Sequence, residues 1–201
     1  MGRKAIDKFR KEPSEKIQKW LKTLLLKLQD VDLEKLTIDD ISKISEKSKA
    51  SIYSYFSSKE DVIYAACETR VNLVYGIIND IKDDRTAPLE IRYSRLIETF
   101  SKGLSDITIS FMKDVKKYYP MSWELINDFS DHFVELLETL YSEGMESGIF
   151  RKMSIPLLKH LDKHFVTNIV TDSELFEDSS YTLDYLVRDY LKLRLVGIEK
   201  P

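Results

Sequence analysis

The sequence predicts an all-helical protein of about nine helices, and three observations carry this prediction. Only six glycines and five prolines occur in 201 residues, so few positions are expected to interrupt a helix. Apolar residues recur at spacings of three and four, the period of an amphipathic helix, rather than with the alternation of a strand. Hydrophobic residues make up 43% of the chain, which is enough for a substantial core.

A first helix is expected from Pro13 and Ser14 onward, and it should support the short helices that follow. Its apolar face comprises Ile17, Trp20, Leu21, Leu24, Leu25 and Leu28. Basic residues precede it at Arg3, Lys4, Lys8, Arg10 and Lys11. This basic arm could follow DNA phosphates or enter a minor groove, or it could be a solvated terminus.

The segment from Thr37 to Asp61 reads as two short helices, a tight turn and the start of a third helix. The Thr37 hydroxyl can cap a helix, and Asp40, three residues later, can reach back to the cap. An apolar stripe follows at Ile38, Ile41 and Ile44. The segment therefore predicts a helix-turn-helix that reads DNA.

The outer residues of the second short helix are expected to form a surface displayed on a scaffold rather than an independent fold. Its inner face holds Ile52 and Phe56, four residues apart, and a two-turn helix is unstable alone in water. Ser57 or Ser58 can cap the next helix, which opens at Lys59.

This segment resembles the DNA-binding domain of the tetracycline-repressor (TetR) family of bacterial transcription regulators. The residues that carry the resemblance are Thr37, Ile38, Ile41, Ser48, Lys49, Ile52, Tyr53, Tyr55, Phe56, Lys59, Glu60 and Val62. The Tyr-x-Tyr-Phe-x-x-Lys-Glu run lies at the family's distance from the capping threonine. The resemblance implies a fold of about nine helices, with a DNA-binding domain at residues 1–58 and an effector-binding and dimerisation domain at 59–201.

The turn departs from the family pattern. Ser45, Glu46 and Lys47 stand where the family usually has Ala-Gly-Val, and Ala50 and Asp32 replace frequent glycines. A left-handed backbone at Glu46 costs about 1–2 kcal/mol that a glycine avoids. We therefore expect either strain or a different turn at Glu46.

The resemblance also implies the DNA contacts. The residues expected to contact phosphates are Thr37, Tyr53, Tyr55 and Lys59. Those expected to contact base edges or the nearby backbone are Lys47, Lys49, Ala50 and Ser51. Ser48 is also expected to belong to the DNA-binding surface. Lysine can reach guanine O6 or N7, and a tyrosine hydroxyl can donate to a phosphate. Packing within the small domain is the alternative role for Tyr53 and Tyr55.

Helical periodicity continues beyond Lys59 to a polar break at Thr86 to Pro88. We expect further helices over residues 89–112, over a short segment ending near Tyr118, and over 122–147 with a stop at Gly148. The last two helices should begin near Ser154 and near residues 178–180.

The last helix has more apolar surface than one face can hold: Tyr181, Leu183, Leu186, Val187, Tyr190, Leu191, Leu193, Leu195 and Val196. Such a helix is buried on two faces. The resemblance implies a four-helix dimer interface with the preceding helix, and the residues expected there are Leu158, Leu161, Phe165, Ile169, Leu186, Tyr190 and Leu193. A core helix buried within one chain is the alternative. A two-fold dimer would read a palindromic operator.

The resemblance further implies a small-molecule effector that releases a repressor from its operator. Candidate lining residues are Tyr75, Phe100, Phe111, Tyr118, Trp123, Asp128, His132 and Phe133. Aromatic side chains can line a ligand cavity, but ordinary core packing, and solvation for Asp128 and His132, are the alternatives. His160 and His164, one turn apart, could share a metal, yet no third ligand stands at a fixed spacing, so no metal site is assigned.

Charge is unevenly distributed along the chain. Residues 1–60 hold 14 Lys and Arg against 10 Asp and Glu, a net charge of +4. Because the whole chain has a net charge of −3, residues 61–201 carry −7. The basic end therefore coincides with the helix-turn-helix. The single cysteine, Cys67, excludes an internal disulfide and suggests either a buried thiol or a redox sensor.

Other classes of function have less support. The sequence has no signal-peptide pattern and no apolar run of membrane-spanning length, so we expect a cytoplasmic protein. It lacks a Gly-rich phosphate loop, a His-Glu-x-x-His motif and a nucleophile elbow, so no catalytic residue, enzyme activity or cofactor is expected. A DNA-binding protein of the same fold without a small effector, and a helical enzyme or interaction module with a vestigial DNA-binding domain, remain as alternatives.

Overall fold

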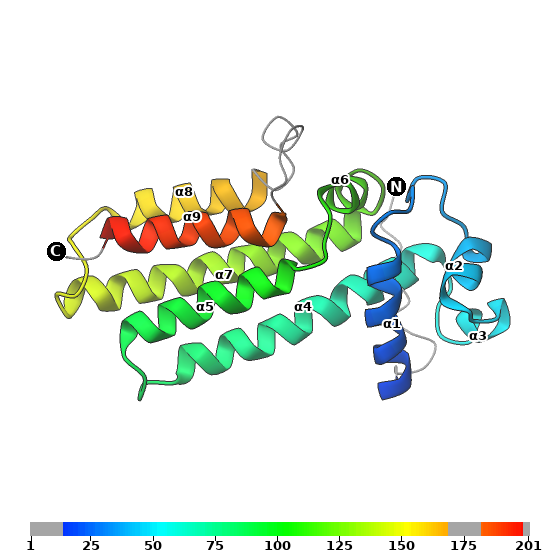
Figure 1. The fold of residues 1–201 in the computed structure, drawn as a ribbon, viewed down its shortest axis with the longest axis horizontal. Coiled ribbons are helices and arrows are strands. Elements are labelled where there is room, and N and C mark those ends of the chain that lie inside the picture. The colour runs from blue at the N-terminus through cyan, green and yellow to red at the C-terminus, as the bar shows by residue number, and fades with distance from the viewer. Residues whose placement is uncertain (1–13, 169–181, 199–201) are drawn as a thin grey trace, which may run out of the picture. The chain divides into compact units, whose positions relative to one another are not determined.

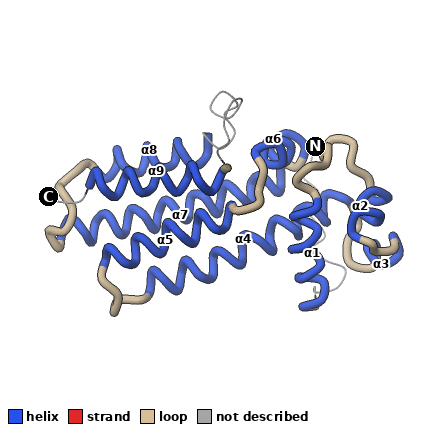
Figure 2. Tube along the Cα trace, viewed as in Figure 1, coloured by secondary structure: helices blue, strands red, loops and turns tan. Residues whose placement is uncertain are grey.

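The computed structural model describes residues 14–168 and 182–198, which form nine α-helices and no β-strand (Figure 1 and Figure 2). The helices are α1 Glu15–Lys27, α2 Ile38–Ser45, α3 Lys49–Tyr53, α4 Lys59–Asp83, α5 Leu89–Leu104, α6 Ile109–Tyr118, α7 Pro120–Glu146, α8 Ile155–Asn168 and α9 Leu183–Ile198. The all-helical prediction is confirmed. The basic arm, Ile169 and Tyr181 lie outside the described residues.

The chain forms two compact units. Among the described residues, the first unit, here called the head, comprises 14–70 and 110–125, and the second, the body, comprises 71–109, 126–168 and 182–198. These units do not coincide with the expected division between residues 58 and 59. Helix α4 contributes to both units, and α6 with the start of α7 belongs to the head.

The core of the head explains why its short helices are stable. Leu21, Leu24 and Leu28, on the predicted face of α1, are at most 1% exposed. Ile41 from α2 and Ile52 from α3 are at most 2% exposed. Burial of a side chain of this size contributes about 1.5–3 kcal/mol. Packing of this kind, rather than helical propensity, stabilises the eight residues of α2 and the five of α3.

The boundary between two predicted helices, 89–112 and the short helix ending near Tyr118, was misplaced. The expected helix over residues 89–112 ends at Leu104, and α6 starts at Ile109. Ser105 has an extended ψ of 140° and Asp106 a left-handed φ of 62°. Serine and aspartate compete with a helical backbone through their own side-chain hydrogen bonds. The prediction was wrong because it followed only the apolar spacing through this segment.

The body is a bundle of helices (Figure 1), and aromatic rings pack between them. Helix α5 packs against α9, and the fully buried rings include Tyr93 on α5, Phe133 and Tyr141 on α7, and Phe150 just after α7. A Cβ at Gly144 would lie 2.0 Å from the Phe150 ring, so only glycine fits there. Gly148 has a φ of 79°, which confirms the predicted stop of α7.

A buried polar cluster also joins the helices of the body. Asp162 on α8 is 0% exposed and accepts hydrogen bonds from the Tyr141 and Tyr190 hydroxyls, both at 2.7 Å, and from Arg194 Nε at 3.0 Å. Burial raises the pKa of Tyr141 and of Tyr190, so both hydroxyls stay protonated as donors. One carboxylate therefore joins α7, α8 and α9.

Candidate nucleic-acid interface

The start of α2 has the predicted capping box. Thr37 Oγ1 accepts a hydrogen bond from the Asp40 amide at 3.2 Å, and the Thr37 amide donates to Asp40 Oδ2 at 3.0 Å. Hydrogen bonds from Thr37 lower the pKa of Asp40. The cap fixes the first turn of α2, and its exposed Thr37 is one of the predicted phosphate contacts.

The turn between α2 and α3 forms without glycine. Glu46 adopts φ 56° and ψ 32°, the left-handed region, as expected for its position. The Lys47 amide donates to the Ser42 carbonyl at 3.1 Å, and Lys27 Nζ donates to the Ile44 carbonyl at 2.9 Å. These bonds satisfy carbonyls at the end of α2 and compensate for the cost of the left-handed residue.

Helix α3 has one buried and one exposed face. Ser48 caps it by accepting from the Ser51 amide at 3.2 Å, and Ile52 points into the core. Lys49, Ala50 and Tyr53 are exposed, with Tyr53 at 44%. This exposed face is the predicted reading surface.

Lys49 forms an ion pair within the head. Its Nζ lies 2.5 Å from Asp39 Oδ1, with both side chains more than half exposed. An exposed pair of this kind contributes only about 0–1 kcal/mol. Lys49 can therefore leave Asp39 for a DNA acceptor at little cost.

Tyr55 and Lys59 have additional roles in the structure. Tyr55 is partly buried and lines a shallow hollow beside Ile17 and Trp20. Lys59 Nζ donates to the Leu36 carbonyl at 2.9 Å and lies 5.8 Å from the centre of the Tyr119 ring. Both residues contribute to packing of the head, whereas Tyr53 is displayed.

The sequence reasoning missed a corner formed by α6 and α7. Asp114 Oδ2 accepts from the Leu33 amide at 3.2 Å, and the Tyr119 hydroxyl donates to the Leu33 carbonyl at 2.9 Å. Burial raises the pKa of Tyr119 to about 12, so its hydroxyl remains a donor. The corner holds the segment that leads into α2. Nothing in the helical periodicity signals such a contact across 81 or more positions of the chain.

The candidate effector residues divide between the two units. Phe111, Tyr118 and Trp123 belong to the head, where Tyr118 donates to Glu34 at 2.8 Å. The other five belong to the body: Tyr75, Phe100, Asp128, His132 and Phe133.

Within the body, four of these five side chains stack on one another in pairs. The Phe100 and Phe133 rings stack at 3.7 Å, and the Tyr75 and His132 rings at 4.5 Å. His132 Nε2 lies 3.2 Å from Asn79 Oδ1, and burial lowers the pKa of His132. Asp128 is exposed. Core packing is thus the role that this conformation gives Phe100 and Phe133.

The candidate dimer residues fall on two faces of α8 and α9. Leu158 and Phe165 are buried within the chain, and Phe165 stacks on Tyr190 at 3.7 Å. Leu186 is partly exposed, whereas Leu161 and Leu193 are 42% and 71% exposed. Exposed apolar residues that the sequence reasoning did not select are Leu157, Tyr185 and Val196.

Other candidate sites can also be placed. Cys67 is buried, and burial raises the pKa of its thiol to about 12, which is the behaviour of a structural thiol. The rings of His160 and His164 lie 6.4 Å apart on the exposed side of α8. Within the described ranges, no three His, Cys, Asp or Glu side chains converge on a metal position. None of the described helices combines the length and apolarity of a membrane span.

Comparisons with known proteins agree with this architecture, although no protein-family model matches the chain. An uncharacterized HTH-type transcriptional regulator of Bacillus subtilis strain 168, YvaF, is 20% identical over 125 residues. This match spans 62% of the present chain and 66% of the relative, slightly less than two thirds of that protein.

Two solved structures share the fold. The TetR family transcriptional regulator PfmR of Thermus thermophilus has a TM-score of 0.67 at 18% identity, over 90% of this chain and 99% of that one. The transcriptional regulator FadR of Bacillus subtilis, solved with stearoyl-CoA, has a TM-score of 0.63 at 19% identity, over 92% and 100%.

Helices α2 and α3, with the turn at Glu46 between them, form a helix-turn-helix within the head. Its fold is that of the TetR-family transcriptional regulators. The resemblance drawn from Thr37 to Val62 is thereby confirmed.

Proposed function

We propose that the protein is a sequence-specific, DNA-binding transcriptional regulator of the TetR type. The observation that carries this proposal is the exposed face of α3. Lys49, Ala50 and Tyr53 project from a helix whose opposite face is fixed in the core by Ile52. A short helix held this way can enter the major groove of DNA.

Each predicted contact has a chemical role in this proposal. Lys49 leaves Asp39 and donates to guanine, while Ser51 donates to or accepts from a base edge. Thr37, Tyr53, Tyr55 and Lys59 contact phosphates, and Lys47, Ser48 and Ala50 approach the bases or the adjacent backbone. The amides at the start of α2 and α4 add positive ends of helix dipoles near these phosphates.

The proposed active form is a homodimer. Exposed Leu161 on α8 and Leu193 on α9 form an apolar surface that a second copy would cover. The space beside Gly197, where a larger residue would place its Cβ, contains no other atom within 4 Å. Another helix can therefore approach closely there. Two heads related by a two-fold axis would read a palindromic operator.

The proposal extends to regulation. A small molecule bound in the body releases the protein from DNA, so the protein acts as a repressor without enzymatic activity in the cytoplasm of a bacterium. The stearoyl-CoA held by the FadR neighbour supports a body that accepts small molecules. Such coupling requires that the ligand bind one conformation more tightly than the other.

A double variant tests the reading surface. On duplexes that the wild-type protein retains from a random pool, Lys49→Ala with Tyr53→Ala is expected to lose at least about ten-fold in affinity, because contacts of this kind contribute about 1–3 kcal/mol. Lys152→Ala, an exposed lysine of the body, serves as the charge control. Full affinity in a folded double variant would refute the assigned surface.

A further inference from the structure

The body contains a hollow that none of the predicted effector residues lines. It lies among helices α4, α5 and α7, and with its open mouth it encloses about 260 Å³. The lining residues are Ile78, Ile81, Lys82, Arg92, Leu96, Leu136, Thr139, Leu140 and Glu143. Most of the wall is therefore aliphatic, with polar groups confined to four side chains. This is the usual composition of a small-molecule site.

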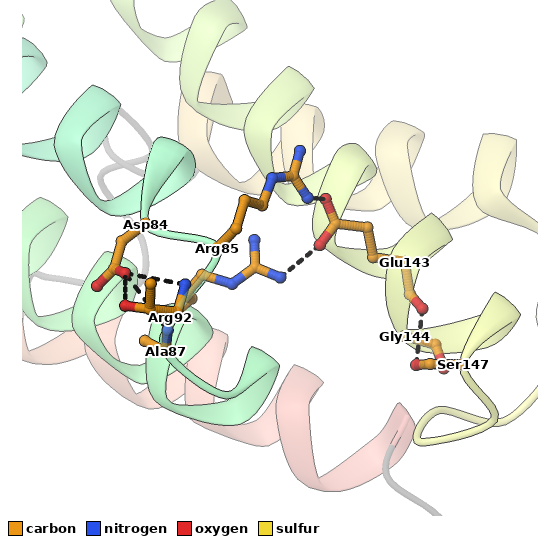
Figure 3. Close-up of polar contacts among 8 residues, drawn as sticks. Asp84, Arg85, Ala87, Arg92, Glu143, Gly144 and Ser147 are labelled. Atoms are coloured by element: carbon orange, nitrogen blue, oxygen red, sulfur yellow. Dashed lines mark hydrogen bonds and ion pairs between the residues drawn. The ribbon is translucent and has the colours of Figure 1, made fainter.

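The Arg92 guanidinium is buried in this wall but only partly used. Its side chain is 8% exposed, and its Nη2 donates to Glu143 Oε2 (Figure 3). Within the described part of the chain, its Nε is buried without a hydrogen-bond partner. A buried donor left without an acceptor is unfavourable, and more so on a charged group. Arg92 is thus a lining residue with one buried donor, Nε, that no acceptor of the described chain uses.

Positive charge exceeds negative charge around the hollow. Glu143 accepts hydrogen bonds from both Arg85 and Arg92 (Figure 3). Although burial opposes the shift, these hydrogen bonds lower the pKa of Glu143, so it remains a carboxylate. One negative charge thus serves two guanidinium groups, and the lining itself holds two positive side chains, Arg92 and Lys82, against the one carboxylate of Glu143. The excess favours an anionic ligand.

We propose that this hollow is an effector site for an amphipathic small molecule with a carboxylate at one end. The carboxylate accepts from Arg92 Nε and from Lys82, and the apolar part lies against Ile78, Leu96 and Leu136. Its role as an effector site rests on the proposed function. Apart from its open mouth, the hollow has room for about one water. Binding therefore separates lining side chains and favours a distinct conformation of the body.

Calorimetric titration of the full chain with octanoate tests the site directly. We expect one octanoate to bind per chain. Octan-1-ol has the same chain length and no charge, and it should bind at least about ten-fold more weakly, because hydrogen bonds to charged groups are stronger than those between neutral groups. Arg92→Gln and Lys82→Gln are each expected to weaken octanoate binding by about ten-fold. Lys152→Gln, outside the hollow, should bind as the wild type does.

Two variants keep the test independent of folding. Arg92→Gln also removes a partner of Glu143, so its thermal unfolding is measured alongside. Lys82→Gln changes a partly exposed side chain and leaves the Arg92–Glu143 pair intact. The inference is overturned if octanoate does not bind up to its solubility, if octan-1-ol binds equally well, or if both variants bind octanoate as tightly as the wild type.

The titration contains no DNA, so it separates this inference from the proposed function. Octanoate binding that depends on Arg92, in a protein that selects no DNA sequence, would contradict the proposed function and leave the site standing. Sequence-specific DNA binding by a protein that ignores octanoate would do the reverse.

Discussion

Thr37 and Asp40 hold the start of α2 through reciprocal hydrogen bonds, and this pair was predictable because a capping box depends only on spacing. Glu46 was harder to anticipate. Its sequence position suggested a left-handed residue or a different turn, and the structure has the left-handed residue, with φ 56°. The bonds that compensate for it, such as Lys27 to the Ile44 carbonyl, join residues 17 positions apart and leave no local pattern in the sequence.

Removing the Thr37 hydroxyl is expected to destabilise the head. Thr37→Ala deletes the cap on the Asp40 amide, and loss of such a cap costs about 1 kcal/mol. Thr23→Ala is the matched control, because the Thr23 hydroxyl donates to a carbonyl in the exposed interior of α1 and caps nothing. Chemical unfolding at pH 7 measures both variants, and an equal loss in the two would contradict a capping role for Thr37.

The same variant carries a pH dependence. Hydrogen bonds from Thr37 lower the pKa of Asp40 in the folded state, so their stabilisation is present above the unfolded pKa of about 3.9. It is lost as pH falls through the lower, folded pKa. The stability difference between wild type and Thr37→Ala should therefore narrow in acid, while the pH-independent cap on the Asp40 amide persists. A difference that widens below pH 4 would contradict this assignment.

Helices were predictable wherever apolar spacing was continuous, and unpredictable where tertiary contacts decided the outcome. The stops at Gly148 and before Pro88 follow from local chemistry. The break at Ser105 and Asp106 did not emerge from apolar periodicity. Asp162 was missed because a carboxylate on an amphipathic helix normally indicates the solvated side, whereas its three donors come from α7 and α9.

Asp162 provides a test of how the helices of the body are joined. Asp162→Ala leaves Arg194 buried without its ion-pair partner, and breaking a buried pair costs about 3–5 kcal/mol. The midpoint of thermal unfolding should fall by roughly 10 °C. Asp131→Ala breaks the exposed pair with Lys163 between α7 and α8 and should cost less than about 1 kcal/mol. Similar midpoints for the two variants would exclude a structural role for the buried cluster.

For the molecule as a whole, the uneven charge and the exposed apolar surface point to two partners. Residues 1–60 carry a net charge of +4 within a chain of −3, which suits a DNA-binding end. On α9, Leu193 and Val196 are 71% and 69% exposed, which suits a second copy. The sequence suggested that α9 has a second buried face. Among the predicted interface residues of α8 and α9, it did not distinguish Leu158, which is buried within the chain, from Leu193, which is exposed.

The proposed dimer can be disrupted by one charge. Leu193→Glu places a carboxylate in the proposed apolar interface and should give a monomer by light scattering, with loss of affinity for a two-half-site operator. Ile91→Glu is the matched control, since Ile91 is 46% exposed on α5 and outside that interface. The proposed interface is wrong if Leu193→Glu remains a dimer.

Selection of DNA from a random duplex pool by the purified protein, at near-physiological salt and followed by sequencing, tests the central claim most directly. A dimeric regulator of the TetR type is expected to enrich a palindrome whose half-sites lie about one helical turn, or a multiple of it, apart. Retained fragments without any common sequence would contradict the claim. That result would mean that the head, with Glu46, Lys47 and Ala50 in and after its turn, does not read DNA.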